Sequence, residues 1–333
     1  MATIDFLTPA YLETIVREAD KKATYDMTVL KTFFKNSKYA ENGFVKVPKE
    51  VFNYEDILPL INRGAGIEAT GLDTSRQYTT YEIKLFGDMK ILKPTDIKAL
   101  VNQLQSLTGD TYKSKKVELA KSIVEEFNTK VNATREYMAC SALLGSIKDK
   151  DGNVIETFDI PTANKLGTKT VSDGTVKTYQ LMSMMKKQMK KSTKYRGAVA
   201  LVLGEGAYET IQGTEEYQTW AALNVNNVSV EDNDSEISGY FGNKKFPFIV
   251  LDEFYYTGGS QVQFFSTNSI IMCPVGVFAE FYTSIETNKG SFAKLKHIDE
   301  YEVWNPDGTA YRLQCSAMPI VTLPNAIITA DLD

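Results

Sequence analysis

Residues 204–206 carry the first two glycines of a dinucleotide-binding loop, so they are the first place where the sequence could hold a cofactor. They follow a predicted buried strand and open a predicted helix, where such a loop would bind a pyrophosphate. The third glycine of that pattern would fall at position 209, which is a glutamate. The pattern therefore fails, and a strand-to-helix turn explains the glycines.

Asp149, Asp151 and Asn153 have the first spacings of a calcium-binding loop. The glycine that such a loop needs would fall at Val154, and its closing glutamate would fall at Ile160. The segment therefore cannot complete the oxygen ligands of the ion. We interpret it as a β-hairpin turn, which an Asp-Gly-Asn sequence favours.

His297 is the only histidine of the chain. It has no cysteine or second histidine at ligand spacing, so no zinc site is expected. A Ser-His-Asp triad would need it too, but the sequence has no Gly-x-Ser-x-Gly elbow. Its apolar neighbours predict a strand residue, and the sequence indicates no enzyme, metal or cofactor. Three widely spaced cysteines in apolar settings are predicted to be buried free thiols: Cys140, Cys273 and Cys315.

The densest basic run lies between residues 186 and 196, and no acid occurs between Tyr179 and Ala198. Such a run is usually a solvated helix face. Contact with nucleic acid or with an acidic neighbour is the alternative. Methionines interleaved with the lysines are predicted to form the core face of the same helix.

The length of 333 residues, with 43% hydrophobic residues, is enough for one elaborate domain or two. No stretch approaches the roughly 18 apolar residues of a transmembrane helix. The first 21 residues lack the apolar centre of a signal peptide, so we expect the product to stay in the cytoplasm. The net charge of −5 argues against a surface that wraps nucleic acid, but not against a wall that encloses it.

A long amphipathic helix is predicted from about Thr111 to Leu144, and the rest of the chain must position it. Apolar residues recur there at three, four and seven positions, and Gly145 is placed to end the helix. At about 1.5 Å per residue the helix is a rod of roughly 50 Å. A rod of that length needs a long surface, which we expect the late strands, from Phe281 onward, to supply.

The segment from Phe44 to Leu92 is predicted to be an extended two-stranded excursion. Its strands alternate apolar and charged residues, and Arg63 and Arg76 lie near its turns. An isolated two-stranded ribbon is marginally stable in water, so its apolar face must lie on another surface, its own subunit's or a neighbour's. The residues that we expect at contacts between subunits are Arg63, Gly64, Arg76, Tyr81, Glu82 and Lys84.

The remaining segments complete the predicted organisation. A short helix from about Ala10 to Lys22 and an apolar segment from Met27 to Phe34 form an N-terminal arm, either frayed or packed on a neighbouring subunit. A β-hairpin follows the long helix, Leu166 to Gly174 is expected to be a loop, and an α/β unit from Tyr179 to Phe281 is inserted before the late strands. That unit is predicted to hold a Met-rich helix, a buried strand and a helix from Gly204 to about Leu223.

In their order and spacing, these segments resemble the major capsid proteins of lambda-type tailed bacteriophages, the capsid protein E family. The resemblance covers most of the chain but departs from the family pattern at Phe158–Pro161, where members tend to have a glycine. The stretches that carry it are Asn62-Arg63-Gly64-Ala65-Gly66, Arg76 to Asp96, Arg135-Glu136-Tyr137, Leu144 to Ile147, Asp151 to Val154, Glu286 to Trp304 and Pro319 to Ala330.

The resemblance implies an α+β fold, the Hong Kong 97-type phage capsid fold. Its parts would be an N-terminal arm (1–43), an extended loop (44–93), a peripheral domain with the long helix (94–178 and 282–333) and an inserted α/β axial domain (179–281). Contacts between axial domains, or with the packaged genome, would use Lys187, Lys190 and Lys191.

The resemblance also implies a function in assembly. Such proteins form hexamers and pentamers that close an icosahedral shell around double-stranded DNA, first as a procapsid in the host cytoplasm. Scaffold, portal and decoration proteins are the expected partners, and DNA would be enclosed without sequence-specific binding. Two alternatives remain open at this point: the shell of an encapsulin-like nanocompartment and, more remotely, a cytoplasmic α/β enzyme.

Overall fold

We describe the chain from a computed structural model, which covers residues 27–48, 78–92, 109–171, 176–223, 239–241, 246–257, 260–286, 292–304 and 307–333. Several predictions fall outside these residues and stay predictions. They concern the helix at Ala10–Lys22, the turn that holds Arg63 and Gly64, and Arg76.

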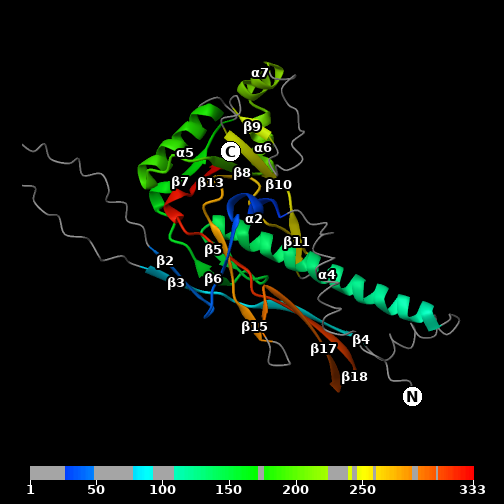
Figure 1. The fold of residues 1–333 in the computed structure, drawn as a ribbon. Coiled ribbons are helices and arrows are strands. Elements are labelled where there is room, and N and C mark those ends of the chain that lie inside the picture. The colour runs from blue at the N-terminus through cyan, green and yellow to red at the C-terminus, as the bar shows by residue number, and fades with distance from the viewer. Residues whose placement is uncertain are drawn as a thin grey trace, which may run out of the picture.

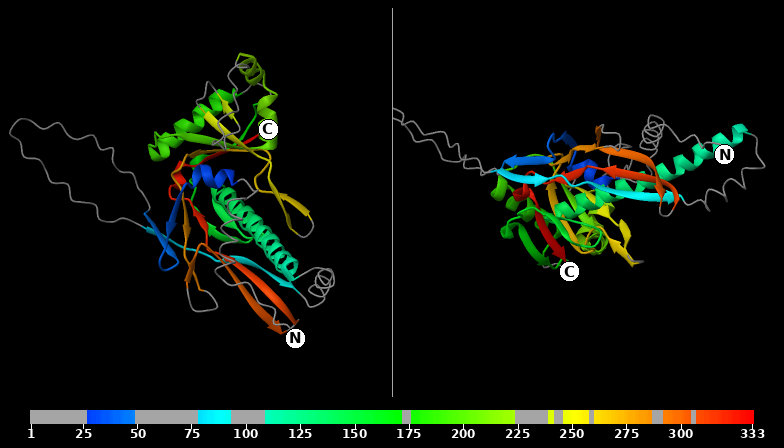
Figure 2. Two further views of the ribbon diagram at one scale, coloured as in Figure 1. Left: turned by 45° about the vertical axis from the view of Figure 1, so that its right-hand side comes forward. Right: turned by 90° about the horizontal axis from the view of Figure 1, so that it is seen from below.

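The predicted long helix is present as α4 (Gly109–Leu143). It ends where Gly145 adopts φ +98°, a backbone conformation that favours glycine. Its apolar stripe, which includes Val124 and Phe127, packs on Leu313 and neighbouring residues of a sheet. Figures 1 and 2 show α4 running along this sheet. The late strands therefore do supply its platform.

That platform is a three-stranded antiparallel sheet, with β18 (Asp307–Cys315) between β17 (Lys296–Trp304) and β4 (Phe86–Leu92). The place of β4 differs from the prediction, which put residues 86–92 in the two-stranded excursion. Gly87 explains the close pairing, because a Cβ at this position would lie 2.1 Å from the carbonyl oxygen of Leu313. Apolar and charged residues alternate through both the ribbon and the segment of β4, so the sequence pattern does not show where the ribbon ends.

The ribbon itself is formed by β2 (Phe44–Pro48) and β3 (Tyr78–Glu82), which pair antiparallel. One face of the ribbon is buried in the main core of the same chain and leaves 5–7% of each side chain exposed. The ribbon therefore lies on its own subunit at this end, which decides between the two surfaces left open by the sequence. The buried residues are Val45, Val47, Tyr81 and Ile83.

The segment 27–40 also packs on its own chain. Helix α2 (Thr28–Phe33) has buried side chains, and Phe33 is fully buried. Strand β1 (Asn36–Tyr39) pairs in parallel with β14 (Ala279–Tyr282), which pairs in turn with β19 (Met318–Ile320). The prediction of an arm that is frayed or leans on a neighbour is wrong for these residues, since their apolar side chains complete the core.

The α/β unit is built on a six-stranded mixed sheet in the order β7-β20-β13-β8-β10-β9. Its helices α5 and α6 pack on one face, and the other face joins the main core. The bounds are β7 (Lys165–Lys169), β20 (Ile328–Leu332), β13 (Ser269–Pro274), β8 (Val199–Gly204), β10 (Phe246–Leu251), β9 (Gly239–Phe241), α5 (Thr178–Thr193), α6 (Glu205–Gln212) and α7 (Glu215–Leu223).

Three predictions for this unit are wrong. Residues 165–169 form strand β7 and not a loop, because pairing with β20 outweighs their polar composition. Strand β20 belongs to this sheet and not to the platform of α4. The single helix expected from Gly204 is divided into α6 and α7 at Gly213 and Thr214, where the Thr214 hydroxyl accepts a hydrogen bond from the Tyr217 N–H and caps α7.

Smaller elements complete the fold. The predicted hairpin after α4 is confirmed, and Asp149 accepts hydrogen bonds from the N–H groups of Asp151 and Asn153 in its turn. No described helix is long and apolar enough to cross a membrane. The remaining bounds are β5 (Ser146–Lys148), β6 (Val154–Thr157), η1 (Thr162–Asn164), β11 (Phe254–Thr257), β12 (Ser260–Gln263), β15 (Ser284–Glu286), β16 (Phe292–Lys294) and η2 (Pro324–Ala326).

Candidate functional site

The ribbon of β2 and β3 presents one free face. Tyr81 is turned away from it, because its ring packs on Phe158 at a centroid distance of 5.4 Å. Burial raises the pKa of Tyr81, and the nearby charges of Glu156 and Asp159 act in the same direction. Of the predicted contact residues, Tyr81 is therefore occupied inside its own chain.

Glu82 and Lys84 lie on the exposed side of the same segment and form an ion pair with each other. Phe44 and Tyr78 project from that face of the ribbon, and they are 57% and 54% exposed. Phe44 lies opposite Glu82 and Tyr78 lies opposite Pro48, so the two aromatic side chains stand at opposite ends of this face. Neither aromatic residue was among the contacts predicted from the sequence, although their positions alternate with the buried ones.

A buried ion pair joins the long helix α4 to the sheet of β1, β14 and β19. Arg135 of α4 donates from Nε and from a terminal nitrogen to Glu280 of β14, at 2.8 and 2.6 Å. The two side chains are only 11% and 5% exposed. Bidentate geometry of this kind fixes orientation as well as distance.

The next residue of the helix, Glu136, holds α2. It is fully buried, and its carboxylate accepts hydrogen bonds from the N–H groups of Val29 and Leu30 at 2.6 and 3.0 Å. These N–H groups stand at the start of α2, where no helical carbonyl is available to them. Two consecutive side chains of α4 therefore fix the helix to two elements that are distant in sequence.

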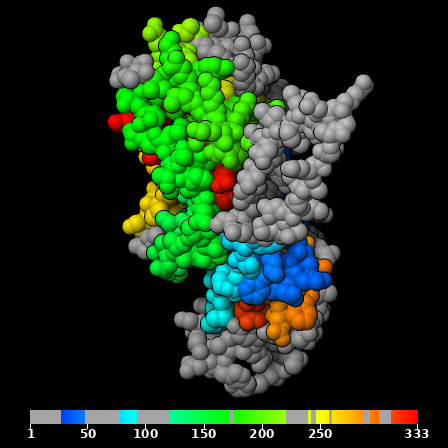
Figure 3. All heavy atoms as spheres, turned by 90° about the vertical axis from the view of Figure 1, so that its left-hand side faces the viewer, coloured from blue at the N-terminus to red at the C-terminus, as the bar shows by residue number. Residues whose placement is uncertain are grey.

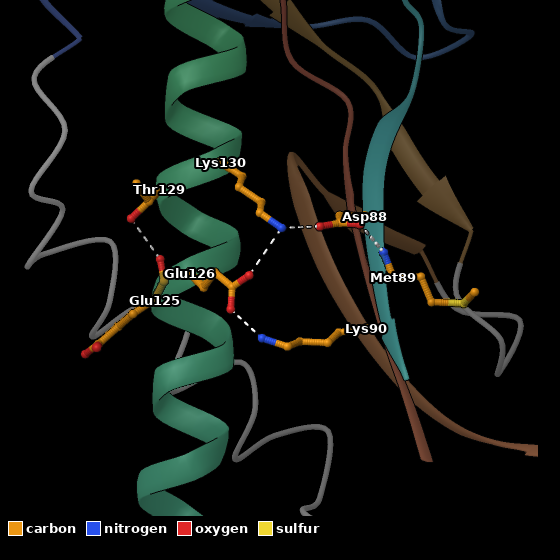
Figure 4. A network of polar contacts seen from close by, with 7 residues as sticks. All are labelled: Asp88, Met89, Lys90, Glu125, Glu126, Thr129 and Lys130. Atoms are coloured by element: carbon orange, nitrogen blue, oxygen red, sulfur yellow. Dashed lines mark hydrogen bonds and ion pairs between the residues drawn. The ribbon is translucent and has the colours of Figure 1, made fainter. Parts of the chain in front are cut away.

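An exposed network joins α4 to β4, as Figure 4 shows. Lys130 contacts Asp88 at 2.7 Å and Glu126 at 3.2 Å, and Lys90 contacts the other oxygen of Glu126. Partial burial alone would raise the pKa of Asp88, but hydrogen bonds from Lys130 and the Met89 N–H, with nearby lysine charges, outweigh it and lower that pKa. The hydrogen bond from Lys90 is the main reason that the pKa of Glu126 is lowered.

The lysine-rich helix α5 has the two faces that the sequence predicts. Met182, Met185 and Met189 are buried in the core beneath it. Lys187, Lys190 and Lys191 are exposed on the other side. Figure 3 shows the face of the molecule where α5 lies, with its green atoms forming a continuous outer surface.

The single histidine and the three cysteines all lie among the described residues. His297 lies in β17, as predicted, and its Nε2 is 2.7 Å from Asp299, whose other oxygen receives Arg312 at 2.7 Å. No group of three acids, histidines or cysteines that could hold a metal occurs among the described residues. All three cysteines are buried and free, and burial raises the pKa of Cys315 to about 11, so its thiol is inert.

The described residues thus form exposed surfaces, and ion pairs and hydrogen bonds that join distant elements of the chain. Comparison with known proteins identifies the family of the chain. Residues 15–332 match the sequence profile of the family described as "Phage major capsid protein E". The chain belongs to this family. The match covers nearly the whole chain and assigns a structural role, that of a phage major capsid protein, and no curated protein matches the capsid protein in sequence.

Solved structures agree on the fold. A protein assigned as the capsid protein of a prophage in E. coli CFT073 has a TM-score of 0.61 at 14% identity, over 98% of this chain and 99% of that one. A phage-related protein from Bordetella bronchiseptica RB50 has a TM-score of 0.54 at 10% identity, over 96% and 95%. The capsid protein therefore has the α+β Hong Kong 97-type fold that the sequence predicted.

Proposed function

We propose that the capsid protein assembles into hexamers and pentamers that close an icosahedral shell around the double-stranded DNA of a tailed bacteriophage. The observation that carries this proposal is the family match over residues 15–332. The geometry supports it, because large side chains such as Phe44 and Tyr78 are exposed on a subunit whose long helix is joined to β14 by the buried pair of Arg135 and Glu280.

The exposed face of the ribbon is the first proposed contact. Phe44, Tyr78, Glu82 and Lys84 would meet an adjacent subunit, with Arg63, Gly64 and Arg76 continuing the contact beyond the described residues. Tyr81 would support this contact from inside its own subunit, since its ring already packs on Phe158.

The proposed partners follow from the proposed role as a capsid protein. DNA would be enclosed without sequence-specific binding, which suits a chain of net charge −5. Scaffold, portal and decoration proteins are proposed partners, and we place assembly in the host bacterial cytoplasm. The axial domain would meet its neighbours through the face of α5 that holds Lys187, Lys190 and Lys191.

Assembly of the purified protein tests this function. We expect sedimentation velocity to show large particles, and negative-stain micrographs to show shells, rings or tubes of six- and five-membered units. A protein that stays monomeric at high concentration near neutral pH contradicts the proposal. Shells that carry a protein cargo instead of DNA, when isolated from the producing cell, would assign the chain to a nanocompartment.

A further inference from the structure

The inserted α/β unit divides its charges between two separate parts of the sequence. Residues 186–196 hold six lysines and arginines and no acid, whereas residues 197–243 hold eight acids and no lysine or arginine. The first basic residues after that stretch are Lys244 and Lys245. A surface helix usually mixes the two signs, so this separation needs a physical explanation.

The fold places most members of the two groups on opposite sides of the α/β unit (Figure 1). Near the C-terminal end of α5, Gln188 and Ser192 hydrogen-bond to Asn164, the residue before the edge strand β7. On the other side, Tyr217 of α7 packs on Phe241 of the opposite edge strand, β9. Figures 1 and 2 show α5 on one side of the unit and α6 and α7 on the other.

Each group forms an exposed face that we name by its residues. The lysine face consists of Lys187, Lys190 and Lys191, and the glutamate face consists of Glu205, Glu209 and Glu215; all six are exposed. Within the part of the chain that the structure describes, none of the six makes an ion pair. Helix α5 reaches the β7 edge through Asn164, whereas α6 lies over β8 and β10 and α7 reaches β9. No ion pair joins the two faces within the described part of one subunit, so each face can meet a partner of opposite charge.

Local helix electrostatics explain only part of this arrangement. Glu205 and Glu215 lie in the first turns of α6 and α7, and Lys190 and Lys191 lie in the last turn of α5, where those charges stabilise a helix. Glu209 does not lie in the first turn of α6, and Lys187 does not lie in the last turn of α5, so the helix dipole does not explain these two residues. The helix dipole also gives no reason to exclude every basic residue from 197–243.

We infer that the lysine face of one copy docks on the glutamate face of the next copy, in a head-to-tail contact around a ring. The inference rests on the proposed function, and it names the two surfaces that meet. A two-fold contact through either face alone would put like charges together, whereas a head-to-tail contact pairs opposite charges at every junction and closes when the rotation does. Binding of the packaged DNA would account for the lysine face but not for the glutamate face.

Charge reversal on each face tests the pairing. The variant K187E/K190E/K191E has two acidic faces, and E205K/E209K/E215K has two basic faces. Each variant alone should lose assembled particles in sedimentation velocity, because every junction then joins like charges. The control K187R/K190R/K191R keeps the charge and should assemble as the wild type does.

Mixing and combining the two variants gives a sharper result. A 1:1 mixture should recover six-membered rings, tubes or sheets, since the two variants can alternate around an even ring. It should not recover closed shells, because alternation fails in a five-membered ring. The variant with all six reversals restores opposite charges at every junction and should form both kinds of ring and closed shells.

Several outcomes would overturn the inference. One is a folded lysine-face variant that assembles normally; if it also retained less DNA, the face would bind the genome instead. Another is two folded variants whose mixture stays unassembled. If circular dichroism shows that the reversals unfold the unit, K187Q/K190Q/K191Q and E209Q replace them, and weaker assembly with a smaller salt dependence is then expected. A wild-type protein that does not assemble would instead contradict the proposed function.

Discussion

At the scale of single residues, Arg135 and Glu280 form the most deeply buried pair of a lysine or arginine with a carboxylate among the described residues. Both side chains are almost fully buried, and their two hydrogen bonds join the long helix to β14. The net contribution of such a pair is small, because desolvation opposes the attraction between the charges. Loss of one partner is different, since it leaves the other charge buried without this counter-charge.

Glu280→Ala should therefore lower the free energy of unfolding by about 3–5 kcal/mol. Urea denaturation of the subunit, followed by circular dichroism, measures this loss. The double variant R135M/E280M should recover most of it, because two packed apolar side chains carry no desolvation penalty. Lys84→Ala is the matched control, since it breaks an exposed pair worth at most about 1 kcal/mol. Equal losses in E280A and K84A would show that burial does not govern the effect.

At the scale of elements, the network of Figure 4 gives the contact between α4 and β4 a dependence on pH. The pKa values of Asp88 and Glu126 are lowered in the folded protein from their ordinary 3.8 and 4.5. A carboxyl group whose pKa is lowered in the folded state stabilises the fold at pH values above its ordinary pKa. This stabilisation is lost as the pH falls through the pKa of the folded state. The side chains are 43–53% exposed, so solvent screening keeps the effect small.

Lys130→Met tests this dependence. The variant should lose less than about 1 kcal/mol relative to wild type at pH 7 and 50 mM salt. The difference should shrink toward zero as the pH is lowered from 5 to 3, and it should also shrink in 1 M salt. Thermal unfolding of both proteins across this pH series provides the measurement. A difference that grew on acidification would contradict the assigned direction of the two pKa shifts.

The pairing of β4 with β18 depends on a glycine. A Cβ at Gly87 would lie 2.1 Å from the Leu313 carbonyl oxygen, so Gly87→Ala must push the two strands apart. Gly152→Ala is the control, because a Cβ there meets nothing within 4 Å and only its positive φ is unfavourable. We expect Gly87→Ala to speed amide exchange across β4 and β18, and Gly152→Ala to leave that exchange unchanged. Similar exchange in both variants would show that the strands absorb the added methyl group.

At the scale of the whole molecule, the ribbon is rooted in the core of its own subunit. Deletion of residues 64–76 should therefore leave the subunit folded, because Val45, Val47 and Ile83 keep their buried contacts. We expect unchanged circular dichroism but no closed shells in micrographs, since the contact with an adjacent subunit would be lost. Loss of the fold would show that the deleted segment packs on its own body, and normal shells would show that it is dispensable.

The sequence predicted local features better than distant pairings. The bounds of α4 were predicted to within two residues, because its apolar stripe and Gly145 are local signals. The buried face of the ribbon was predicted from alternation, but alternation does not tell which surface covers that face. The partners of β4 and β20 depend on strands far away in the sequence, and the polar strand β7 forms only because β20 lies beside it. The charged surfaces were visible in the sequence, yet their opposite placement needed the sheet order.

The parallel pairing of β1 with β14 has a consequence for the timing of synthesis. Asn36 lies opposite Ala279, so a ribosome must add roughly 240 further residues before β1 meets its partner strand. At about 5–20 residues per second, this takes roughly 12 to 50 s. During that interval the nascent subunit lacks β14, the strand with which β1 pairs. The early segment can therefore complete the core only when synthesis of the subunit is nearly finished.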